Sequence, residues 1–106
     1  MSGTIERLRA LCGGPRDGAL LRFSLGTALL GDGAAADAAI EFRRALEFNP
    51  DYSAAWKLLG RALVESGDAA QARQAWNDGI GAAQRVGDVQ AEKEMRVFLK
   101  RLDKSG

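Results

Sequence analysis

The residue types that most often carry out catalysis are scarce in this chain. Its 106 residues include no histidine, which removes the commonest general acid–base group and the usual partner of a nucleophilic serine or cysteine. The single cysteine, Cys12, falls on an apolar helical stripe, where a buried structural thiol is a better interpretation than a nucleophile. We therefore predict that the protein is not an enzyme. A lone cysteine also excludes an intrachain disulfide and is compatible with a reducing compartment.

Two further features suggest ligand sites but have simpler interpretations. The segments Gly13-Gly14-Pro15 and Gly31-Asp32-Gly33 superficially resemble phosphate-binding loops. No strand precedes them and no Gly-Lys-Ser/Thr sequence follows, so we interpret both as helix breaks. The acidic residues lack the spacing of metal ligands. We expect neither a cofactor nor a metal ion.

The charge pattern argues against nucleic acid and membrane partners. The formal net charge is +1, so no bulk field attracts a polyanion. A weak basic cluster near the end is interpreted as a solvated helix face, and it consists of Arg96, Lys100, Arg101 and Lys104, with Asp103 among them. No apolar run approaches the roughly 18 residues that span a bilayer. We predict a cytoplasmic protein that binds neither nucleic acid nor a membrane.

An internal repeat of 34 residues organises the chain. With 46% hydrophobic and 27% charged residues, the composition is that of one globular domain over residues 1–106. Residues 19–52 align with residues 53–86 without an insertion. Small and large apolar residues coincide in this alignment: Leu25, Gly26, Ala28, Leu29 and Phe42 fall on Leu59, Gly60, Ala62, Leu63 and Trp76.

This period and these residues resemble the tetratricopeptide repeat family. Its pattern has a Trp, then Leu-Gly, and later an Ala, a Phe and a closing Pro. The second unit matches with Trp56, Leu59, Gly60, Ala72 and Trp76, and the first matches with Leu25, Gly26, Ala38, Phe42, Ala45 and Pro50. Arg22 stands at the Trp position of the first unit, and Gln84 replaces Pro in the second. The resemblance implies an all-α fold of tandem antiparallel helical hairpins.

The expected elements follow from breaks and caps along the chain. The two repeat units are predicted over 17–50 and 51–86, with cap helices over 4–12 and 88–104. Each cap helix has an apolar stripe, formed by Ile5, Leu8 and Cys12 and by Ala91, Met95, Phe98 and Leu102. Asp17 is predicted to cap the first repeat helix, and Asp68 with Gln71 resembles a capping box. The missing proline at Gln84 predicts a longer last helix in the second unit.

The resemblance also implies where a partner binds. In this family the first helix of each hairpin lines a concave groove that holds partner segments. Carried over to this sequence, the groove positions are Phe23, Thr27 and Leu30 in the first unit and Lys57, Arg61 and Val64 in the second, with Arg96 and Leu99 added if the terminal helix acts as a third first-type helix. Such a groove is apolar at one end and basic at the other. It suits an acidic segment or a free C-terminal carboxylate.

Two functions compete at this point. The leading hypothesis is a non-enzymatic adaptor, a monomer or weak homodimer, that binds a segment of another protein in the groove. The alternative is a structural module whose repeats stack between subunits. A plainer interpretation of the groove residues also stands. In it the N-terminal helix covers Phe23, while Lys57 and Arg61 are ordinary solubilising charges.

Overall fold

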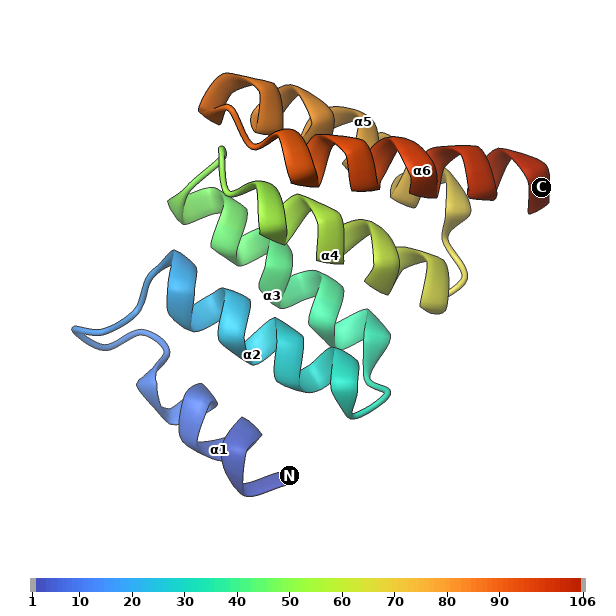
Figure 1. The fold of residues 1–106 in the computed structure, drawn as a ribbon. Helices are drawn as coiled ribbons and strands as arrows, with labels where there is room; N and C mark the ends of the chain where they lie inside the picture. Colours follow the sequence, from blue (N-terminus) through green and yellow to red (C-terminus); the bar gives the residue numbers. More distant parts are fainter. Residues whose placement is uncertain (1, 106) are drawn as a thin grey trace.

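The computed structural model describes residues 2–105, and these form six helices joined by short turns (Figure 1). Their bounds are α1 Ser2–Leu11, α2 Ala19–Gly31, α3 Ala35–Phe48, α4 Ser53–Glu65, α5 Ala69–Val86 and α6 Val89–Ser105. Residues 2–105 contain no strand, which confirms the predicted all-helical fold. The fifth helix has 18 residues against 14 in α3, as the missing proline predicted.

The helices form a curved stack rather than a closed bundle. Each helix packs against the next, and α2 also contacts α4, as α4 contacts α6. Within the described chain, the backbones of α3 and α5 do not approach each other, although the side chains of Arg43 and Gln71 hydrogen-bond between them. Helices α2, α4 and α6 therefore lie on the inner side of the curve. Helix α1 covers one end of the stack, where it lies against α2, and α6 covers the other (Figure 1).

Both terminal helices bury the stripes predicted for them. Ile5, Leu8 and Cys12 pack against the main core, which includes Leu25, Leu29, Phe42 and Leu59. At the other end Ala91 and Met95 are buried beside Trp76 and Ile80. The ends of the repeat pair are thereby closed, which a two-repeat solenoid requires because one unit cannot bury its own apolar faces.

Glycines without room for a side chain set the spacing within each hairpin. A Cβ atom added to Gly26 would lie 2.7 Å from Cε1 of Phe42. At the equivalent place of the second unit, a Cβ on Gly60 would fall onto the indole of Trp76. That indole is fixed, because its Nε1–H donates a hydrogen bond of 3.0 Å to the carbonyl of Lys57. The aligned Gly–aromatic pairs therefore report close helix packing.

Capping of α5 follows the sequence prediction, and α6 is capped in the same way. Asp68 accepts a hydrogen bond of 3.1 Å from the backbone N–H of Gln71, and Asp88 accepts one of 3.0 Å from the backbone N–H of Ala91. Gly87 ends α5 with a φ of 73°, a left-handed conformation that glycine adopts without a steric penalty. These caps fix where α5 and α6 begin.

The first unit departs from the prediction, because Asp17 does not cap α2. Gly18 precedes the helix and makes no side-chain cap. Asp17 instead accepts hydrogen bonds of 2.8 Å from Arg22 Nη2 and from the backbone N–H of Gly13. Arg22 Nη1 also donates to Glu41 Oε1 at 2.9 Å. The guanidinium at the family's tryptophan position therefore joins the α1–α2 loop to α3.

This arrangement makes the stability of the fold sensitive to acid. The hydrogen bonds from Arg22, and then from Gly13, hold the pKa of Asp17 far below its usual value of 3.8. Ionised Asp17 therefore stabilises the fold fully above about pH 4, and this contribution is lost as the pH falls through its low folded pKa. We expect Asp17→Asn to melt several degrees below the wild type at pH 7 and to approach it at pH 2. Thermal melts across this range would count against the account if the difference stayed constant.

Candidate functional site

The concave face is the inner surface of α2, α4 and α6. The residues of α2 that were predicted to line it differ in how exposed they are. Phe23 is half-buried, because its ring packs against Phe42 at 5.8 Å and against Tyr52 at 4.9 Å between centroids. Thr27 is exposed, and its hydroxyl donates to the carbonyl of Phe23. Leu30 is half-buried and packs against the core. Helix α2 therefore offers a mainly apolar surface with Thr27 at its centre.

Helix α4 brings one paired and one accessible cation to this face. Lys57 donates from Nζ to Glu94 Oε1 at 2.9 Å, and its side chain is only 27% exposed. Arg61 is exposed and lies 4.0 Å from Glu65, a distance that gives little attraction in water. Val64, one turn further on, is 41% exposed. Arg61, rather than Lys57, is the cation of α4 available to a partner.

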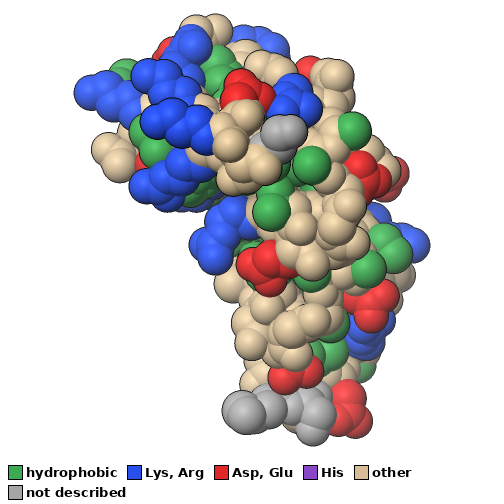
Figure 2. Space-filling model, turned by 90° about the vertical axis from the view of Figure 1, so that its right-hand side faces the viewer, with side chains coloured by type: hydrophobic (Ala, Val, Ile, Leu, Met, Phe, Trp, Pro, Cys, Tyr) green, Lys and Arg blue, Asp and Glu red, His purple; other side chains and the backbone are tan. Residues whose placement is uncertain are grey.

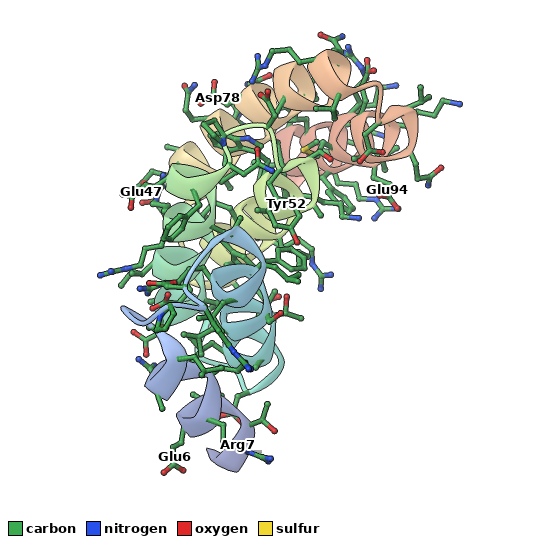
Figure 3. All side chains as sticks on the ribbon, turned by 90° about the vertical axis from the view of Figure 1, so that its left-hand side faces the viewer. Glu6, Arg7, Glu47, Tyr52, Asp78 and Glu94 are labelled. Atoms are coloured by element: carbon green, nitrogen blue, oxygen red, sulfur yellow. The ribbon has the colours of Figure 1, made fainter. Side chains whose placement is uncertain are left out.

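Two polar contacts hold the beginnings of α4 and α6 together. Besides the Lys57–Glu94 pair, Ser53 Oγ donates to Asp88 Oδ2 at 2.6 Å. The hydrogen bond from Lys57 is the main reason that the pKa of Glu94 is lowered, and that from Ser53 has the same effect on the pKa of Asp88. Glu94 lies on the side of the stack opposite to Glu47 and Asp78 (Figure 3). Helix α6 thus acts as a third inner helix.

Arg96 does not join the other predicted groove residues. It pairs with Glu92 at 2.9 Å, and Glu92 in turn accepts a hydrogen bond from Gln84 of α5. Arg96 therefore projects toward the α5 side of α6, away from Glu94. Leu99 also packs against the core at this end, beside Trp76 and Ile80. In the structure α6 therefore presents both Arg96 and Leu99 toward α5, apart from the other residues predicted to line the groove.

A pocket at the α6 end of the concave face contains residues that the sequence did not mark as a site. This open hollow has a volume of about 170 Å³ and is lined by Val64, Trp76, Phe98, Arg101, Leu102 and Ser105. Of these residues only Val64 was predicted to face a partner. Arg101 stood in the basic cluster interpreted as a solvated face. Trp76 and Phe98 matched core patterns, so no sequence signal separated the pocket floor from the core.

The described residues show no constellation for metal chemistry. Among residues 2–105, no three Cys, Asp or Glu side chains gather closely enough to hold an ion. The buried polar side chains of this part of the chain all have hydrogen-bond partners. None of the six helices has the length and apolar character needed to cross a membrane.

Comparison with known proteins places this architecture in a family. The profile of the tetratricopeptide repeat family matches residues 29–92, which is more than half of the chain. The chain belongs to the tetratricopeptide repeat family. A TPR repeat-containing protein of Pseudomonas aeruginosa is 50% identical over 101 residues, which cover 95% of this chain and 96% of that protein. The resemblance drawn from the 34-residue period is confirmed.

Two solved structures are also similar to this chain. The solution structure of a protein from Bordetella parapertussis is similar, with a TM-score of 0.84 and 46% identity, over 99% of this chain and 91% of that one. The crystal structure of a tetratricopeptide repeat domain protein from Salinibacter ruber has a TM-score of 0.76 over 83% of this chain and 98% of that one. Its identity is 20%, so it speaks for the fold alone. These relatives are all bacterial.

Proposed function

We propose that this protein is a non-enzymatic adaptor that binds a segment of another protein across its concave face. The observation that carries the proposal is the open inner surface. Among the described residues, the backbone of α1 approaches only that of α2, and the backbone of α6 does not approach that of α2, so neither terminal helix lies across this face. Tetratricopeptide repeats generally act in protein–protein interaction, and an inner face with exposed Thr27, Arg61 and Val64 suits that role.

The α6 end of the stack favours an adaptor over a module whose repeats stack between subunits. A further repeat would need an apolar surface on the outer side of α6. That side instead carries Lys93, Arg96 and Lys100, all exposed. Continued stacking would desolvate Lys93 and Lys100 without a counterion. We therefore propose a monomer that resides in the cytoplasm, where its single free cysteine can remain reduced.

Capture experiments with one charge reversal on each face test the proposal. We expect the wild type and Arg44→Glu, a reversal on the outer helix α3, to capture the same partner from a bacterial lysate. Arg61→Glu should reduce capture about tenfold, because it places a like charge against an acidic segment. Both arginines are exposed, so neither reversal should unfold the domain. Equal capture by Arg61→Glu and the wild type would refute the assignment of this face.

A further inference from the structure

The pocket between the ends of α4 and α6 is preformed. Its floor is Trp76, which is 4% exposed and is held by the hydrogen bond to the Lys57 carbonyl. Phe98 packs against this indole with ring centroids 5.2 Å apart. Val64 and Leu102 form the sides, and Arg101 stands at the wall on α6. Because the floor is fixed by packing and a hydrogen bond, little ordering is required when a ligand enters.

The size of the pocket suits one side chain. Its volume is about 170 Å³. An apolar cavity of ~150 Å³ accommodates a benzene molecule. A leucine, isoleucine or phenylalanine side chain therefore fits, whereas a folded surface does not enter. The exposed lining is mainly apolar, so a side chain of this kind would leave no polar group unpaired.

The charge around the pocket is basic and uncompensated. The three acidic residues of α6 are each engaged: Glu92 with Arg96, Glu94 with Lys57, and Asp103 with Arg73. Among residues 2–105, no carboxylate lies within ion-pair distance of Lys93, Lys100, Arg101 or Lys104, all of which are exposed. Figure 2 shows Lys and Arg side chains gathered at the α6 end of the molecule. The overall charge of +1 conceals this local excess.

We propose that this pocket takes a single aliphatic or aromatic side chain of an acidic partner segment, with a carboxylate of the segment against Arg101. The inference rests on the proposed function, because the pocket lies at the α6 end of the same concave face. Arg101 also lines the neighbouring hollow beside Glu94 and Val97. A segment anchored in the pocket would therefore meet this cation directly.

Two other polyanions fit the observations less well. A membrane-binding helix presents an apolar stripe beside its basic face. In α6 that stripe is turned inward, where Ala91 and Met95 are buried. A nucleic-acid surface extends over a wider basic area, whereas Glu94 and Asp103 flank the basic face of α6 on its two sides. The apolar lining of the pocket also offers a phosphate group no hydrogen-bond donor.

Selection from a library of short random peptides displayed on phage tests the proposal. With the immobilised full chain at low salt, we expect enriched peptides to place Asp or Glu within two positions of Leu, Ile or Phe. The affinity of the best peptide, measured by fluorescence anisotropy, should fall about tenfold in Arg101→Glu and in Val64→Gln. The matched control Arg16→Glu, an exposed reversal in the α1–α2 loop, should bind within about twofold of the wild type.

The outcomes separate this inference from the function on which it rests. Peptides without acidic residues, or peptides whose binding is lost in Arg61→Glu but not in Arg101→Glu, would overturn the pocket and leave the concave face as the binding surface. A wild type that enriches no peptide would contradict both. The wild type could instead bind a short duplex oligonucleotide or phosphatidylglycerol vesicles and enrich no peptide. If Arg101→Glu abolished that binding, the basic face would bind the polyanion and the proposal would be refuted.

Discussion

Replacing Gly60 by alanine is expected to destabilise the domain by about 3 kcal/mol. The added methyl group would overlap the Nε1 edge of Trp76. The indole cannot move aside cheaply, because it is 4% exposed and its Nε1–H is bonded to the carbonyl of Lys57. Either α4 moves away from α5 or this hydrogen bond is lost. Urea unfolding monitored by circular dichroism measures the loss.

The same substitution at two other glycines provides a comparison for the stability change at Gly60. Gly26→Ala meets Phe42 at 2.7 Å and should cost less, about 2 kcal/mol, because the phenyl ring has no hydrogen bond to lose. Gly81 lies inside α5, where a Cβ would meet only Arg85 Nη1 at 3.5 Å. Gly81→Ala should therefore stabilise the protein by roughly 0.5 kcal/mol through helix propensity. If Gly60→Ala were as stable as Gly81→Ala, α4 would not pack closely against Trp76 of α5 at this position.

Removing the cation at Arg22 is the second large effect. We expect Arg22→Met to cost about 2 kcal/mol, because Glu41 would keep its charge in a site where its side chain is 11% exposed. The cost stays below the ~3–5 kcal/mol of a fully buried pair, since water reaches part of the site. The measurement is again urea unfolding at pH 7.

A double-mutant cycle distinguishes an uncompensated charge from lost packing. Arg22→Met/Glu41→Leu should regain most of the stability, because two apolar side chains can replace a buried pair. Glu41→Gln alone should cost under about 1 kcal/mol, since its amide oxygen can still accept from Arg22. If the effects of Arg22→Met and Glu41→Leu simply add, the pair is not coupled and Arg22 acts through packing alone.

The repeat architecture was predictable because its determinants recur at a fixed spacing. Gly26 and Phe42 reappear as Gly60 and Trp76 one period later, and each pair lies within a single hairpin. The caps at Asp68 and Gly87 are equally local. Such features depend on neighbours a few residues away or on the next helix, so the sequence pattern contains them.

The ion pairs were not predictable, because a carboxylate can choose among several nearby donors and because other partners meet only when the hairpins stack. Asp17 has the residue type of an N-cap, but the guanidinium of Arg22 offers its carboxylate stronger, charge-assisted hydrogen bonds. Lys57 was assigned as a groove cation, yet Glu94, 37 residues further along, neutralises it once α6 packs beside α4. The apolar stripe of α6 predicted which side of this helix is buried. It did not predict whether α4 or α5 lies on the side where Arg96 projects.

A partner segment on the concave face would change the surroundings of the backbone amides of α2 and α4. The most direct measurement is the change in backbone amide chemical shifts of the ¹⁵N-labelled protein when a captured or selected peptide is added. We predict that the largest changes fall at Thr27, Arg61 and Val64, while Glu47 of α3 and Asp78 of α5 stay unchanged. Changes centred on α3 and α5 would place the partner on the outer helices and contradict the account.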